Sequence, residues 1–188
     1  MNKKTTQRNE VISHWQELEN REQLEEKLQQ RLFDLAEWKE ANVIATTIAK
    51  GVEWNTEQII YHAWQEGKKV AIPKSNPIDH TMKFYLYSED DQLEKVWKDI
   101  LEPIEASSTY ISEDGIDLLI VPGIVFNKQG FRIGFGGGFY DRFLKGYTGV
   151  TVSLVANFQL MKNMLIEEHD QSVDILLTNF GKVYCKHT

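Results

Sequence analysis

The sequence predicts an α/β fold with a mostly parallel sheet, helices on both of its faces, and further helices at the N-terminus. After residue 41, short β-branched or apolar stretches alternate with amphipathic ones. The segment DLLIVPG (117–123) is a nearly continuous apolar run, typical of a central strand buried on both faces. Residues 4–38 lack Gly and Pro and are rich in helix-forming residues. We expect one domain over 1–188, with the N-terminal helical segment (1–40) packed on it.

Apolar spacing divides the N-terminal segment into two helices. Two sets of apolar residues recur at helical spacing, and the phase slips near Asn20 and Arg21: Val11, Trp15, Leu18; Leu24, Leu28, Leu32, Leu35. The charged residues between them are typical of a solvated face.

The rest of the chain alternates between expected strands and helices. We expect Thr56 to cap a helix that Gly67 ends, and Pro73 to end a strand. The expected strands are 42–49, 68–73, 82–87, 117–123, 150–157 and 173–179, with an edge strand at 181–186; the expected helices are 57–66, 91–100 and one beginning at 139.

Composition narrows the function classes. A formal charge of -7 disfavours nucleic-acid and anionic-membrane binding, although a local pocket for a small anion remains possible. One cysteine, Cys185, excludes a disulfide framework and fits a reducing compartment. The first ten residues have no apolar core of a secretory signal, and no run is long enough to span a bilayer. We therefore expect a cytoplasmic protein.

Glycines concentrate in NKQGFRIGFGGGFYDRFL (127–144), soon after the most buried expected strand. In α/β sheets, ligands bind beyond the carboxyl ends of strands. Glycines let a ligand approach the backbone, and successive free amides can form an anion nest. Arg132 and Arg142 offer donors that suit phosphate, and Asp141 could hold Mg²⁺ beside phosphate oxygens. These features predict a site for nucleotide phosphate.

Two observations keep another interpretation of this loop open. The spacing matches neither G-x-x-x-x-G-K-[ST] nor G-x-G-x-x-G. A glycine-rich turn that merely permits tight packing is therefore the structural alternative.

The same segment resembles the signature of the 5-formyltetrahydrofolate cyclo-ligase family, also called methenyltetrahydrofolate synthetases. That signature reads approximately as Pro-Gly, an apolar stretch with Phe, then G-x-R-x-G-x-G-x-G-[YF]-Y-D. The matching residues are Pro122, Gly123, Phe126, Gly130, Arg132, Gly134, Gly136, Gly138, Phe139, Tyr140 and Asp141. Phe139 stands where Tyr is commoner, and Gln7 replaces a Leu in the K-x-x-L-R element that Lys4 and Arg8 match.

Weaker similarities follow in the family's order. They comprise an E-x-x-T element at Glu53 and Thr56, a Met-x-Phe segment at Met82, an acidic-Pro pair at Glu102, and a closing H-D-x-x-V-D segment from His169. The resemblance covers almost the whole chain, and it is weakest over the first 45 residues.

The resemblance implies a fold, a reaction and its co-substrates. The fold would be a three-layer, Rossmann-like α/β/α arrangement. The enzyme would use ATP and Mg²⁺ to convert 5-formyltetrahydrofolate to 5,10-methenyltetrahydrofolate, releasing ADP and phosphate through a phosphorylated imidate. We expect small-molecule substrates, no nucleic-acid or membrane partner, and a monomer or weak dimer.

The resemblance also assigns residues to this reaction. Arg132 and Asp141 would be catalytic, and Asp141 with Asp170 would hold Mg²⁺, with Asp174 as the alternative to Asp170. The implied ATP-binding residues are Lys4, Arg8, Arg132, Ile133, Gly134, Phe135, Gly136, Gly137, Gly138, Phe139 and Tyr140; the implied substrate-binding residues are Glu53, Trp54, Phe135 and Phe139.

Several of these assignments have a plainer structural reading. Lys4 and Arg8 could form a surface cluster, Glu53 could be a loop carboxylate, Asp174 could be a turn residue, and Phe139 could be core. Two other functions also remain: a related α/β enzyme, such as a sugar-phosphate isomerase or CoA-transferase, that needs no MgATP, or a binding protein that has lost turnover.

Overall fold

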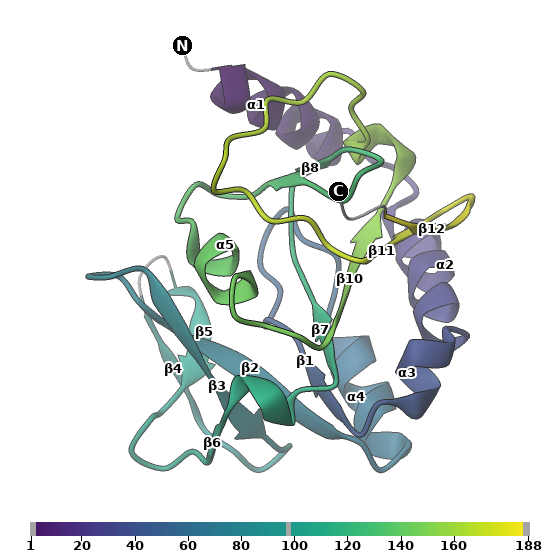
Figure 1. The fold of residues 1–188 in the computed structure, drawn as a ribbon. Coiled ribbons are helices and arrows are strands. Elements are labelled where there is room, and N and C mark those ends of the chain that lie inside the picture. Colours follow the sequence, from purple (N-terminus) through teal and green to yellow (C-terminus); the bar gives the residue numbers. More distant parts are fainter. Residues whose placement is uncertain (1–2, 97–98, 186–188) are drawn as a thin grey trace.

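A computed structural model describes residues 3–96 and 99–185, and its centre is one large sheet (Figure 1). The strands of this sheet are β1 (Val43–Ala45), β2 (Lys69–Asn76), β3 (Thr81–Tyr87), β6 (Tyr110–Ile111), β7 (Leu118–Ile120), β10 (Val150–Val155), β11 (Ile175–Thr178) and β12 (Gly181–Tyr184). Their order is β12-β11-β10-β7-β1-β2-β3-β6. The neighbours from β11 to β2 are parallel, while β12, β3 and β6 run antiparallel at the edges. The predicted mostly parallel sheet and its edge strand are confirmed.

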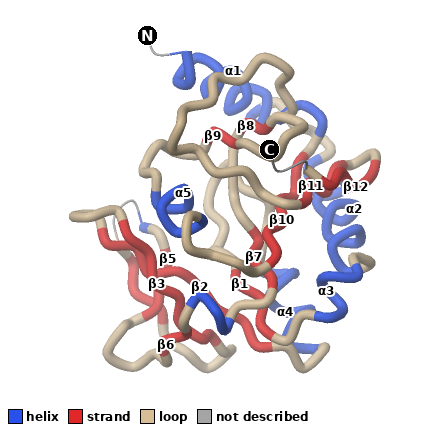
Figure 2. The backbone as a smooth tube through the Cα atoms, viewed as in Figure 1, coloured by secondary structure: helices blue, strands red, loops and turns tan. Residues whose placement is uncertain are grey.

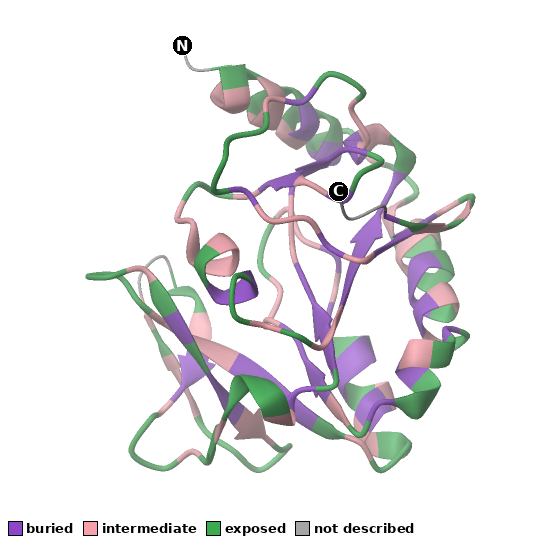
Figure 3. Ribbon diagram, viewed as in Figure 1, coloured by how far each residue is buried: buried purple, intermediate pink, exposed green. Residues whose placement is uncertain are grey.

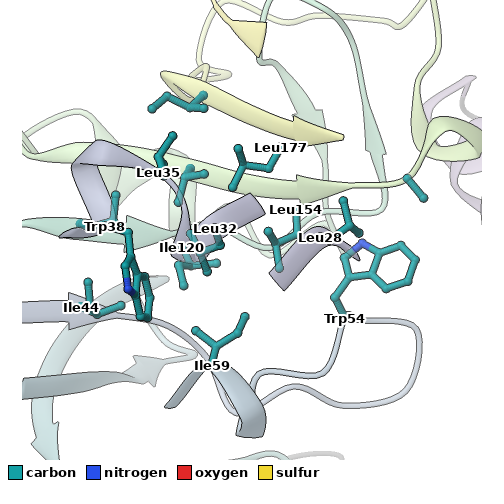
Figure 4. Close-up of a cluster of buried hydrophobic side chains, with 14 of the residues drawn as sticks. Leu28, Leu32, Leu35, Trp38, Ile44, Trp54, Ile59, Ile120, Leu154 and Leu177 are labelled. Atoms are coloured by element: carbon teal, nitrogen blue, oxygen red, sulfur yellow. The ribbon is translucent and has the colours of Figure 1, made fainter. Parts of the chain in front are cut away.

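Helices cover both faces of the sheet. Successive strand residues point to opposite sides, so the apolar strands contribute side chains to a core on each face. The helices are α1 (Lys3–Gln16), α2 (Arg21–Phe33), α3 (Ala36–Glu40), α4 (Glu57–Gln65) and α5 (Phe139–Leu144). On one face, Ile44 lies in a core cluster with residues of α2, α3 and α4, namely Leu28, Leu32, Trp38 and Ile59 (Figure 4). Leu118 of β7 belongs to the same cluster. Their neighbours Ala45 and Leu119 face α5 and pack with Phe143 and Leu144. The predicted three-layer α/β/α arrangement is confirmed.

The N-terminal helices break where the apolar phase slips. α1 ends at Gln16, and α2 begins at Arg21. A short third helix, α3, follows and buries Trp38. α1 lies across one end of the sheet (Figure 1), and it buries Val11 and Trp15 in the core.

The expected helix at 91–100 is wrong. β4 (Leu93–Lys95) pairs antiparallel with β5 (Leu101–Pro103) in a small separate sheet. Lys74 of β2 forms an ion pair with Glu94, so contacts with the neighbouring strand outweigh the helix propensity of this segment. Residues 97 and 98 of that expected helix lie outside the described residues.

Pro73 does not end its strand, because β1 pairs with β2 only over Lys69–Ala71. From Pro73 on, that edge of β2 has no β1 partner to receive an N–H, so proline is tolerated there. The strand expected at 42–49 is only three residues long, and the edge strand ends at Tyr184, with residue 186 outside the description.

The helix α4 begins after Thr56 as predicted, but Thr56 does not cap it through its side chain. The Thr56 hydroxyl accepts the Ala49 N–H at 2.9 Å instead. It thereby closes the loop between β1 and α4.

Several short elements complete the chain. They are η2 (Glu113–Gly115) and η3 (Asn157–Gln159), both 3₁₀ helices, and the hairpin of β8 (Val125–Phe126) and β9 (Arg132–Ile133). Buried positions concentrate on the central strands and on the helix faces that meet them (Figure 3). Within 3–96 and 99–185, no helix combines the length and apolar character needed to cross a membrane.

Candidate active site

The glycine loop joins β9 to α5 at the end of the sheet where β7 and β10 finish (Figure 2). Gly136 and Gly138 have φ of 96° and 68°, a region that side-chain-bearing residues rarely adopt. Gly138 immediately precedes α5, which is only six residues long. Backbone amides and flanking side chains, more than a helix dipole, would therefore bind an anion here.

Arg132 is buried and forms the centre of a small polar network. Its Nη1 donates to the Gln171 carbonyl at 2.8 Å, and its Nη2 lies 3.2 Å from Asp141 Oδ1. The same Asp141 oxygen accepts the Gln171 N–H at 3.1 Å. Burial lowers the pKa of Arg132, and the charges of Asp141 and Asp170 oppose this effect. The network thus holds the glycine motif against the segment before β11.

Lys4 and Arg8, one helical turn apart on α1, both reach this network's surroundings. Lys4 Nζ bonds to Glu167 at 2.6 Å and to Asp170 at 2.7 Å. Arg8 Nε donates to the Gly134 carbonyl at 2.7 Å. Burial acts to lower the pKa of Lys4, but its bonds to Asp170 and Glu167 outweigh burial and raise it. Both cations therefore lie at the glycine loop or beside it, not in an isolated surface cluster.

Asp170 and Asp174 occupy different environments. Asp170 is buried, and it can offer ligand atoms together with Glu167 and His169, all within 4.8 Å of one another. Asp174 Oδ2 instead accepts the Thr151 N–H at 2.8 Å at the start of β10. Carboxylate oxygens suit a hard cation such as Mg²⁺, so the geometry favours Asp170 over Asp174 as a metal ligand.

Glu53 lies in the loop between β1 and α4, another loop at the carboxyl end of a parallel strand. Its Oε2 accepts the Lys50 N–H at 2.8 Å. Burial raises the pKa of Glu53, and the Lys50 bond partly opposes that rise. Tyr140, in the first turn of α5, has its pKa raised by burial and then by the charge of Glu53. The charge of Glu53 therefore acts on Tyr140 of the glycine motif.

The predicted aromatic contacts differ in accessibility. Phe135 is 60% exposed at the tip of the glycine loop, and the Phe139 ring lies 5.2 Å from the His80 ring. Trp54 is buried, its ring centre lies 4.2 Å from that of Trp15 in a tilted contact, and its Nε1 donates to Gln159 Oε1 at 2.9 Å. Phe135 is thus open to a ligand, whereas Trp54 supports the loop from within.

Gln159 and Gln171 did not emerge from the sequence. Gln159 is fully buried, and its amide nitrogen donates to the Gly123 and Ile124 carbonyls at 3.3 and 3.2 Å. Together with its bond to Trp54, this links the loops that follow β1, β7 and β10. A lone glutamine carries no spacing or charge signal, and Gln171 acts through its backbone, so neither had a pattern to reveal it.

Comparison with known proteins identifies related chains. The model of the 5-formyltetrahydrofolate cyclo-ligase family matches residues 1–179. The 5-formyltetrahydrofolate cyclo-ligase of Haemophilus influenzae is 30% identical over 160 residues, covering 82% of this chain and 86% of the relative. The mouse 5-formyltetrahydrofolate cyclo-ligase is 29% identical over 162 residues, covering 80% of this chain and 79% of the relative.

Solved structures resemble the fold described above. The NMR structure of 5,10-methenyltetrahydrofolate synthetase from Aquifex aeolicus has a TM-score of 0.84 at 26% identity, covering 98% of this chain and 94% of that chain. The Mycoplasma pneumoniae 5,10-methenyltetrahydrofolate synthetase has a TM-score of 0.75 at 19% identity, which supports the fold alone.

Proposed function

This chain belongs to the 5-formyltetrahydrofolate cyclo-ligase family, and from that premise we propose how its residues convert 5-formyltetrahydrofolate to 5,10-methenyltetrahydrofolate. The family is ATP-dependent, and the observation that carries the proposal is the grouping of three cations around the glycine loop and the segment before β11. Arg8 binds the Gly134 carbonyl of the loop, while Arg132 and Lys4 bind neighbouring residues of the segment before β11, Gln171 and Asp170. Three cations around a loop with accessible backbone suit a triphosphate.

The chemistry explains why ATP is consumed. The formamide nitrogen donates into the carbonyl, so the formyl carbon is a poor electrophile. The formyl oxygen attacks the γ-phosphorus, the bond from that phosphorus to the bridging oxygen breaks, and ADP leaves. N10 of the folate then attacks the activated carbon, the C–O bond breaks, phosphate departs and the N10 proton is lost. ATP thereby converts the formyl oxygen into a leaving group.

The protein's role is to position two ligands and to neutralise charge. The amides of the segment from Gly134 to Gly138 would line the triphosphate, and Arg132 would stabilise the charge that develops on the transferred group. Lys4 would exchange its present carboxylate partners for phosphate oxygens. Phe135 and Phe139 would contact the folate or the nucleotide rings from the same loop.

The carboxylates here fit Mg²⁺ by the chemistry of their donor atoms. Asp170 is buried among polar partners. The two contacts of Asp141 described above, with Arg132 and with the Gln171 N–H, both use Oδ1, so Oδ2 would remain available to hold the cation. When bound, Mg²⁺ would neutralise charge on the phosphate oxygens.

The two candidate aspartates predict different phenotypes. Asp170→Asn is expected to raise the Mg²⁺ concentration for half-maximal activity by roughly tenfold or more. Asp174→Asn should leave that concentration unchanged and lower the thermal midpoint, because it weakens the two bonds that the Asp174 carboxylate accepts from the N–H and the hydroxyl of Thr151. Activity titrations with Mg²⁺ and thermal melts of both variants test this, and the reverse pattern would move the metal site to Asp174.

Glu53 would bind the pterin, since a carboxylate accepts from the 2-amino group and N3–H. Glu53→Gln is expected to raise the KM for 5-formyltetrahydrofolate far more than the KM for ATP.

The raised pKa of Glu53 adds a pH dependence. As the pH falls toward that pKa, the Glu53 carboxylate is protonated and kcat/KM for the folate falls. This acid limb should begin above the ordinary value of 4.5 and disappear in Glu53→Gln. Equal losses for both substrates would remove the pterin role.

The whole proposal is tested by near-ultraviolet absorbance, because the methenyl product has a conjugated chromophore that the substrate lacks. Purified protein with 5-formyltetrahydrofolate, ATP and Mg²⁺ should give a rise that omission of either ATP or Mg²⁺ abolishes. ATP binding measured by calorimetry without any such rise would retain the phosphate site and reject the substrate. A rise without ATP would reject the mechanism.

A further inference from the structure

One face of α2 holds the loop that carries Glu53. Arg21, Glu25 and Gln29 follow one another at intervals of four residues, so their side chains form a stripe on the helix. Each of the three bonds to the main chain of residues 51–55. The sequence suggests only a polar face here, yet this stripe contacts a single loop.

Arg21 makes the contacts nearest to Glu53. Its Nη1 donates to the Gly51 carbonyl at 3.1 Å, and its Nη2 donates to the Glu53 carbonyl at 2.5 Å. The guanidinium carbon lies 5.1 Å from the centre of the Trp15 ring, and the Trp15 ring packs against the Trp54 ring in a tilted contact. The planar guanidinium of Arg21 thus donates to two carbonyls of the turn through separate nitrogens. A lysine ammonium would not reproduce this arrangement.

Glu25 and Gln29 form further hydrogen bonds to the main chain of the same loop. Glu25 Oε1 accepts from Arg21 Nε at 2.9 Å and from the Asn55 N–H at 3.0 Å. Gln29 Nε2 donates to the Asn55 carbonyl at 3.1 Å. The loop is therefore fixed at residues 51, 53 and 55, on both sides of the Glu53 side chain.

The carboxylate of Glu53 is itself tied to the conformation of this turn. Glu53 Oε2 is fixed by the Lys50 N–H, so the direction of the carboxylate depends on the backbone of residues 50–53. Gly51 has φ 65° and, as a glycine, can leave this left-handed conformation at little cost. A hollow of about 350 Å³ lies between α2 and the loop, lined by Arg21, Glu25, Gly51 and Glu53 among others. Without Arg21, the turn would have room to move.

We propose that Arg21 is a positioning residue for 5-formyltetrahydrofolate: by binding the Gly51 and Glu53 carbonyls, it aims the Glu53 carboxylate at the pterin. This inference rests on the proposed role of Glu53 in binding the substrate. It makes α2 the support of the folate site, while α1 supports the phosphate site through Lys4 and Arg8.

The test compares Arg21→Met with Lys27→Met. Methionine keeps an unbranched stem over Trp15 and removes the donors, and Lys27 is an exposed cation of the same helix. For Arg21→Met we expect the KM for 5-formyltetrahydrofolate to rise about tenfold, with the KM for ATP and the thermal midpoint nearly unchanged. Lys27→Met should match the parent protein in all three.

A double-mutant cycle with Glu53→Gln separates positioning from general support. If Arg21 acts through Glu53, adding Arg21→Met to Glu53→Gln should raise the folate KM no further. Unchanged kinetics for Arg21→Met, equal rises in both KM values, or additive effects in the cycle would each overturn the inference. If calorimetry shows that the unsubstituted protein does not bind 5-formyltetrahydrofolate, the proposed function falls first, and the inference falls with it.

Discussion

Arg132→Lys is expected to reduce turnover by about a hundredfold to a thousandfold, in the range found when one preorganised donor to a developing negative charge is lost. The Arg132 guanidinium binds the Gln171 carbonyl and Asp141 at the same time, through different nitrogens. A lysine ammonium is a compact charge on a flexible stem, and it would have to give up one of these partners or its reach to a phosphate. Steady-state absorbance kinetics at saturating ATP measure the loss.

The interpretation of this variant depends on the protein remaining folded. Arg132 is 5% exposed, so its replacement also disturbs a buried ion pair. Arg31→Lys, in α2, makes the same chemical change elsewhere and serves as the control. Circular dichroism and a thermal melt should show a folded variant with a lowered midpoint. Turnover within a few-fold of the parent would remove Arg132 from the proposed mechanism.

Most of the fold could be predicted because its signals are local. Leu118 and Leu119 belong to one apolar run, and the structure buries them in cores on opposite faces of the sheet. The helix prediction for 91–100 failed for the opposite reason. Its strand β4 is stabilised by non-local contacts, the pairing with β5 and the ion pair with Lys74. Propensity describes a segment alone, and it cannot include a partner that the chain supplies from elsewhere.

The candidate site was predictable to the extent that its residues form a recognisable pattern. The glycines, Arg132 and Asp141 lie in one motif, whereas Lys4 and Arg8 acquire meaning only when α1 crosses the end of the sheet. The residues that support the site left no such pattern. Gln159 acts through burial and Arg21 through backbone carbonyls, and both properties arise only from tertiary structure.

Asp141→Asn is expected to lower turnover by about a hundredfold and to raise the Mg²⁺ concentration needed for half-maximal activity. The substitution keeps the size of the side chain and removes its charge. The amide oxygen of the introduced side chain would still be able to accept the Gln171 N–H, so the connection to the segment before β11 should persist. Two effects would remain: a weaker cation site and a buried Arg132 without its nearest anion.

A Mg²⁺ titration distinguishes these two effects. If Asp141 serves only to hold Arg132, then kcat falls while the half-saturating Mg²⁺ concentration stays at its original value, and the proposed metal role is wrong. Asp117→Asn is the matched control, because Asp117 accepts the Asn42 and Val43 N–H groups at the amino end of β7, away from the glycine loop. That variant should lose stability without any change in Mg²⁺ dependence. A rise in half-saturating Mg²⁺ for Asp141→Asn alone therefore links the last residue of the glycine motif to the metal, and through the metal to the transferred phosphate.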